Sequence, residues 1–194
     1  MISITHFNLV LVSAALLAPC CASAQIAAEP GPAVAQRFGG ADAVPTLSSV
    51  QYVLSASEDG AREVALADIA LGKSPSQDVR RLAAQIRDDY GDANAELVQI
   101  AVGMGVSPPK GNDSSDVEII KTLNGKDGAE FDLAYLTAVV SAHAHAISLC
   151  NAGMKGHSTA AAAFATRRLQ VLQNRWQLAD ALLAKVRSAA ADLH

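Results

Sequence analysis

Apolar side chains recur at alternating spacings of three and four residues along most of the chain after Thr46. This spacing places them on one face of an α-helix, and it predicts four long helices that pack as a bundle. The second of these helices has the most regular stripe, formed by Val79, Leu82, Ile86, Tyr90, Ala93, Leu97, Ile100 and Met104. We therefore expect an all-α fold over residues 46–190.

Capping residues mark the ends of the first two predicted helices. Ser48 and Gln51 form a capping box. The helix that they open is expected to run to about Leu71 and to stop at Gly72. The segment Ser74–Gln77 contains a second capping box, with a proline at the first helical position, and it predicts the start of the next helix.

The connections between the helices predict the topology. The third helix is expected to begin at the capping box of Asp127–Glu130, and the fourth at Ser158 or Thr159. Only a few residues join the first helix to the second and the third to the fourth, so each pair must form an antiparallel hairpin. The longer link contains a polar, proline-containing break at 106–117 and a short helical segment ending at Asn124. Two hairpins joined by a long crossover form the ferritin-like arrangement of a four-helix bundle.

Small side chains indicate close packing between these helices. Only 4% of the residues are aromatic, and alanine is abundant. Gly60 lies inside the first predicted helix, where a glycine costs up to about 1 kcal/mol relative to alanine. We expect Gly60 to mark either a close helix contact or a kink.

The chain begins with a segment, residues 1–24, that contains no Lys, Arg, Asp or Glu and ends in the small residues Ala-Ser-Ala. This pattern predicts an export signal that is cut after Ala24, and it predicts a periplasmic or secreted protein. The apolar run is too short for a permanent transmembrane helix. Residues 25–45 mix Ala, Gly and Pro without periodicity, which indicates a flexible leader.

Charge and cysteine content exclude some classes of function. The net charge of −4 gives no attraction to nucleic acid or to an anionic membrane. Removal of the signal would leave Cys150 as the single cysteine, with no internal disulfide. Because free cysteines are often buried, we expect an inert core thiol at Cys150, with an intermolecular bridge as the alternative.

Three segments of the chain resemble the exported bacterial ferritin-like family filed as domain-of-unknown-function 4142. The resemblance covers about Val50 to Val186. The segments are GAREVALADIALGKSPSQDVRRLAAQIRDDYGDANAEL, LNGKDGAEFDLAYLTAVVSAHAHA and RRLQVLQNRWQLADALL. The resemblance implies a ferritin-like fold and export, and it implies no particular activity.

The family's polar pattern is only partly present in this chain. The positions that match it are Glu63, Asp89, Phe131, Asp132, Tyr135 and His143. Tyr90 and Arg175 stand where the pattern has histidines, and Ala142 stands where it has an aspartate. The Glu-x-x-His motif of di-iron oxidases occurs nowhere in the sequence.

Two interpretations of the remaining polar positions follow. His143 and His145 are two residues apart on one helix, so one is expected to face the core and the other the solvent. In the first interpretation, His143 is a hydrogen-bonded core residue, Tyr90 fills a vacated ligand position and Arg175 neutralises a nearby carboxylate. In the second, His143, Glu63 and Asp89 hold iron or another transition metal. We favour the first, because buried polar groups need partners more often than metals.

Helix geometry adds expectations about the carboxylates. The helical rise places Glu63 nearer the level of Ile86 than that of Tyr90, roughly 9 Å away, with Glu58 closer to Tyr90. Asp132 lies about 16 Å from His143 along the same helix. Its predicted role is a favourable charge in the first helical turn.

The sequence thus favours an exported, non-catalytic helical-bundle protein of the bacterial envelope. It would be a binding or stress-related module with a degenerate ferritin-like site and a protein or small-molecule partner. The alternative is a ferritin-like protein that binds or oxidises a transition metal, and a third class is an assembly protein that forms a homodimer. We expect no catalytic residues, and we expect the pairs Arg80–Arg81 and Arg167–Arg168 to lie on solvated helix faces.

Overall fold

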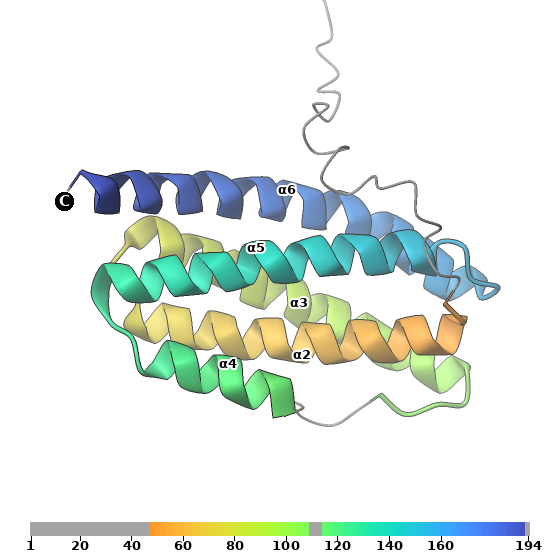
Figure 1. The fold of residues 1–194 in the computed structure, drawn as a ribbon. Helices are drawn as coiled ribbons and strands as arrows, with labels where there is room; N and C mark the ends of the chain where they lie inside the picture. Colours follow the sequence, from red (N-terminus) through yellow and green to blue (C-terminus); the bar gives the residue numbers. More distant parts are fainter. Residues whose placement is uncertain (1–46, 109–113, 193–194) are drawn as a thin grey trace, which may run out of the picture. The chain divides into compact units, whose positions relative to one another are not determined.

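The computed structural model describes residues 47–108 and 114–192, and the predicted signal and leader lie outside this part of the chain. Within it the structure is all-α, as predicted. The long helices run side by side, and a shorter helix lies against two of them (Figure 1). The elements are α2 (Ser49–Lys73), α3 (Gln77–Gly103), the short α4 (Ser114–Asn124), α5 (Gly128–Gly153) and α6 (Thr159–Ala191).

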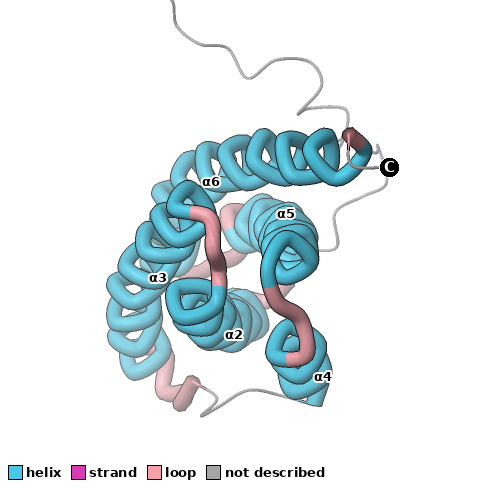
Figure 2. The backbone as a smooth tube through the Cα atoms, turned by 90° about the vertical axis from the view of Figure 1, so that its left-hand side faces the viewer, coloured by secondary structure: helices cyan, strands magenta, loops and turns pink. Residues whose placement is uncertain are grey.

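The helices are arranged as two hairpins. α2 packs most extensively on α3, and α5 on α6. α2 also contacts α5, and α3 contacts α6, which closes the bundle around a shared core (Figure 2). The link from α3 to α5 contains α4, which lies against α2 and α5 and ends at Asn124 as predicted. The prediction of two hairpins joined by a long connection is therefore confirmed.

The turn between α2 and α3 differs from the prediction. α2 continues past Gly72 to Lys73, and the N-cap of α3 is Ser76, whose hydroxyl accepts a hydrogen bond from the Val79 amide. Pro75 disfavours the helical conformation in the residue before it, so Ser74 is extended and ends α2 instead of opening α3. The next available hydroxyl, that of Ser76, then becomes the cap.

The start of α5 also differs from the prediction. Asp127 occupies the N-cap position, but its side chain makes no capping hydrogen bond. Its carboxylate lies 3.2 Å from Lys73 Nζ instead. Asp132 was expected to place a favourable charge in the first turn, but the acidic residue there is Glu130. Asp132 is buried and accepts a 2.6 Å hydrogen bond from the Ser74 hydroxyl. The bond ties the first turns of α5 to the α2–α3 turn.

Glycines allow two close approaches between helices. A Cβ atom on Gly60 would overlap the amide of Asn94 on α3, so the prediction of a close helix contact at Gly60 is confirmed. A Cβ atom on Gly153 would overlap the ring of Tyr52 in the same way. α2 can therefore approach both neighbours closely because these positions lack side chains.

α5 is the most apolar of the described helices. By length and composition alone it could cross a membrane, and 44% of its most apolar window is buried in the bundle. A core helix passes the same test, and α5 also carries the buried polar residues Asp132 and His143. Its composition is accounted for by its place in the core.

Candidate functional site

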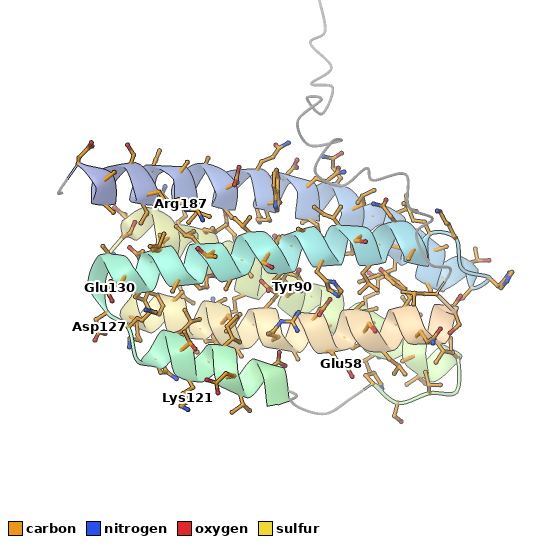
Figure 3. All side chains as sticks on the ribbon, viewed as in Figure 1. Glu58, Tyr90, Lys121, Asp127, Glu130 and Arg187 are labelled. Atoms are coloured by element: carbon orange, nitrogen blue, oxygen red, sulfur yellow. The ribbon has the colours of Figure 1, made fainter. Side chains whose placement is uncertain are left out.

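One group of buried polar side chains in the core comes from three helices. Glu63 lies on α2, Tyr90 on α3, and Tyr135 and His143 on α5. All four are buried, and Tyr90 lies in the interior of the bundle (Figure 3). The amphipathic pattern of each helix turns these residues inward together with its apolar stripe.

His143 is held through one of its ring nitrogens. Its Nδ1 lies 3.1 Å from the Val139 carbonyl oxygen and 3.7 Å from Glu63 Oε2. A carbonyl only accepts hydrogen bonds, so this contact requires the proton on Nδ1. The Nε2 atom then carries a lone pair, and it is buried without a hydrogen-bond partner.

Burial keeps both side chains of this pair uncharged over a wide pH range. It lowers the pKa of His143 to about 4, an effect that the hydrogen bond to Val139 opposes in part. It raises the pKa of Glu63 to about 8, and the nearby positive charge of Arg62 opposes this. The 3.7 Å contact would be an ion pair only between charged partners, yet both groups are neutral between about pH 4 and pH 8. We therefore describe it as a neutral carboxylic acid beside a neutral imidazole.

Two phenols complete this part of the core. The rings of Tyr90 and His143 meet edge to face, with centroids 5.8 Å apart. Tyr135 stacks on Phe131 at 6.1 Å. Burial raises the pKa of Tyr90 and of Tyr135 above the usual value, and the proximity of Glu63 adds to the rise. Neither hydroxyl has a hydrogen-bond partner in the described structure.

Asp89 does not join this group, because its carboxylate is bound by Arg175. Arg175 Nε lies 2.8 Å and Nη2 2.7 Å from Asp89 Oδ2, which makes a close, charge-assisted contact. The expected neutralisation of a carboxylate by Arg175 is therefore present. Of the three predicted metal ligands, the structure brings Glu63 and His143 together and leaves Asp89 with Arg175. The described residues contain no group of three or more His, Cys, Asp or Glu side chains arranged to hold a metal ion.

Glu63 and Tyr90 were expected at different levels along the bundle axis, and the side chains of both lie beside His143. Glu58, which was expected nearer to Tyr90, is exposed on the outer face of α2. His143 extends from a third helix and contacts both residues, which a count along α2 and α3 alone could not include.

A second polar group lies in a groove between α2, α4 and α5. Arg62 forms ion pairs with Asp59 and with Asp116 on α4, the latter at 3.3 Å. His145 Nε2, on the exposed face of α5, lies 3.5 Å from Asp59 Oδ2. His145 was expected to face the solvent, and this second polar group was not predicted from the sequence. The spacing of Asp59 and Arg62 by three residues was the available signal.

Arg168 was expected on a solvated face, and this expectation was wrong. Its guanidinium lies over the ring of Tyr90, 5.0 Å from the centroid, and its Nη2 atom is buried without a partner. Arg167 is exposed as expected and pairs with Glu96. Adjacent helical residues point in different directions, so a pair of arginines does not define one face.

Cys150 is a buried free thiol, as expected. Its Sγ lies 3.7 Å from the hydroxyl of Tyr52, and burial raises its pKa. A buried thiol with a raised pKa is a poor nucleophile. This position therefore adds no reactive group to the core.

The fold and its interior define an all-α bundle of two helical hairpins with a small polar centre. Residues 35–182 match a family described as Domain of unknown function (DUF4142). The chain belongs to this family. The searches of curated proteins and of solved structures found no match.

Proposed function

We propose that this chain is an exported, non-catalytic binding or stress-related module of the bacterial envelope, with a structural polar core in place of a metal centre. The observation that carries the proposal is the separation of the three candidate ligands. Arg175 holds Asp89, while His143 faces Glu63 with the nitrogen that already bonds to Val139. A metal ion needs a lone pair on the ligating nitrogen, and Nδ1 uses that position for its proton.

Export is supported by the sequence of residues 1–24. They lack charged side chains and end in a small-residue cleavage pattern after Ala24. The partner would bind outside the core. The groove with Arg62, Asp116 and His145 offers both charged and neutral hydrogen-bonding groups for a protein or small-molecule partner.

A metal-binding function is the second candidate, and one observation favours it. A metal-ligating histidine usually donates its other ring N–H to a carbonyl or carboxylate, as His143 does to Val139. This leaves the lone pair of Nε2 available, and both oxygens of Glu63 also lack partners. A transition metal held by His143 Nε2, with Glu63 turned toward it, would supply Lewis-acid or redox chemistry.

Elemental analysis distinguishes the two candidates. The full chain would be expressed with its predicted export signal in place, recovered from the periplasm and purified without chelators or an affinity tag. His143→Ala and the exposed His145→Ala would be prepared in parallel. We expect no stoichiometric metal in any of the three proteins. Stoichiometric iron, manganese, copper or zinc that is lost only in His143→Ala would support the metal-binding function instead.

The same preparation tests export. We expect the protein in the osmotic-shock fraction, with an intact mass that corresponds to a chain beginning at Gln25. A cytoplasmic protein of full mass would contradict the envelope location without bearing on the metal result.

A further inference from the structure

A small cavity lies inside the bundle between the four long helices. Its volume is about 20 Å³, and its wall is mostly apolar. Roughly 10–15 Å³ is enough to hold one water molecule, whereas a drug-sized ligand needs about 300 Å³ or more. The size of the cavity therefore restricts its contents to one or two water-sized molecules.

Four polar atoms without hydrogen-bond partners belong to residues that line this cavity. They are Asp59 Oδ2, Tyr90 Oη, Asn94 Oδ1 and Arg168 Nη2. Asp59 and Tyr90 are only 7% and 6% exposed, so bulk solvent does not satisfy them. His145 lies 3.5 Å from Asp59 Oδ2 but makes no hydrogen bond to it. Buried polar atoms of this kind usually bind ordered water when no protein group reaches them.

The hydrogen-bond donors and acceptors among the four atoms indicate which kind of molecule the cavity can hold. Asp59 and Asn94 present acceptors, while Arg168 presents a donor and the Tyr90 hydroxyl is able to donate. An anion would meet the carboxylate of Asp59, and a cation would meet the guanidinium of Arg168. An apolar guest would leave all four atoms unsatisfied. Water donates twice and accepts twice, so it matches two acceptors and two donors.

We propose that this cavity is a binding site for at least one ordered water molecule that bridges α2, α3 and α6 through Asp59, Asn94, Tyr90 and Arg168. The absence of a side chain at Gly60 lets the Asn94 amide lie against α2. The bound water links polar groups that the protein leaves unpaired. This site is distinct from the contact between His143 and Glu63, and it does not depend on whether a metal binds there.

Magnetic relaxation dispersion of ¹⁷O in water tests the proposal, because it counts water molecules that stay inside a protein for longer than nanoseconds. The full chain would be compared with Ala93→Val, which adds two methyl groups at the cavity wall, and with Ala95→Val. Both alanines lie on α3, but Ala95 is exposed, so the control carries the same change in helix propensity. We expect the dispersion amplitude to fall by at least one long-lived water in Ala93→Val and to be unchanged in Ala95→Val.

An equal amplitude in the wild type and Ala93→Val would overturn the proposal. A second measurement needs no variant and stays decisive if Ala93→Val does not fold. The dispersion of the wild-type protein alone should show at least one long-lived water, and a wild-type dispersion without any long-lived water would also overturn the proposal.

Discussion

The contact between His143 and Glu63 and the contact between His145 and Asp59 join the same two helices in two different environments. The nitrogen–oxygen distances are similar, 3.7 Å in the core and 3.5 Å at the surface. The side chains of the core pair are 0% and 1% exposed, whereas those of His145 and Asp59 are 62% and 11% exposed. Two residues along α5 thus separate a pair that is buried on both sides from a pair whose histidine is exposed and whose carboxylate is buried.

The comparison shows that burial, more than distance, determines what such a pair can do. In the core, the cost of desolvating a charge keeps His143 and Glu63 neutral over a wide pH range. Around the exposed ring of His145, water and salt screen the interaction, and exposed pairs typically contribute about 0–1 kcal/mol. Replacing His143 should therefore change stability more than replacing His145.

The largest expected effect is that of Glu63→Gln at alkaline pH. The pKa of Glu63 is raised by burial from 4.5 to about 8, so the folded protein holds a proton there that the unfolded chain loses above about pH 4.5. Wild-type stability should fall as the pH rises through this window, and the neutral amide should remove the fall. We expect Glu63→Gln to be more stable than the wild type by about 2–4 kcal/mol at pH 9, and the difference to shrink toward pH 4.5.

Urea unfolding at a series of pH values measures this difference. Arg62, Asp59 and Asp116 also act on the pKa of Glu63, and they are the same in both proteins. Glu58→Gln, at an exposed position on the same helix, is the matched control and should run parallel to the wild type. Parallel curves for Glu63→Gln and the wild type would contradict the account of a neutral buried carboxylic acid.

His143→Gln should have the second largest effect. It disturbs a buried ring held by the Val139 carbonyl, and we expect a loss of about 1–3 kcal/mol near neutral pH. The pKa of His143 is lowered by burial from 6.5 to about 4, so wild-type stability should fall as the pH drops through this window. The variant should lack that acid-side fall.

The comparison with His145→Gln makes the His143 prediction specific. Chemical unfolding should show a change below about 0.5 kcal/mol for the exposed histidine, as is usual for surface substitutions. Equal losses for the two variants would mean that burial does not distinguish the two pairs.

Among Glu63→Gln, His143→Gln and Arg175→Met, the last should have the smallest effect. It leaves Asp89 without its partner, but both side chains are partly exposed, at 24% and 30%. We therefore expect a loss of about 1–2 kcal/mol at neutral pH, less than for a fully buried pair. Thermal unfolding beside the exposed Arg187→Met would measure it, and a loss no larger than that of Arg187→Met would count against the ion pair.

Much of the fold was predictable because helical periodicity and capping are local properties. Both hydrogen bonds of the capping box are present. The Ser48 amide donates to Gln51 Oε1 at 3.0 Å, and the Gln51 amide donates to Ser48 Oγ at 3.1 Å. The short turns forced the two hairpins, and the inward position of His143 followed from the stripe on α5. The predicted start of α3 was two residues too early. Two serines flank Pro75, and only the backbone conformation decides which of them caps the helix.

The candidate site was less predictable because its contacts join different helices. Counting residues from one hairpin could not place Glu63 beside a histidine of the other hairpin. The position of Arg168 over Tyr90 and the burial of Asp132 against Ser74 likewise depend on how neighbouring helices cross.

The sequence by itself determined the helices, the hairpin topology and which face of each helix is buried, since these follow from spacing, turn length and the hydrophobic effect. Only the tertiary structure decided which polar groups meet. Helix tilt and side-chain reach shift contacts by several ångströms, and a shift of that size separates a hydrogen bond from no interaction. Contacts between helices produce the neutral pair of His143 and Glu63 and the ion pair of Asp89 with Arg175. They also place the polar atoms around the cavity.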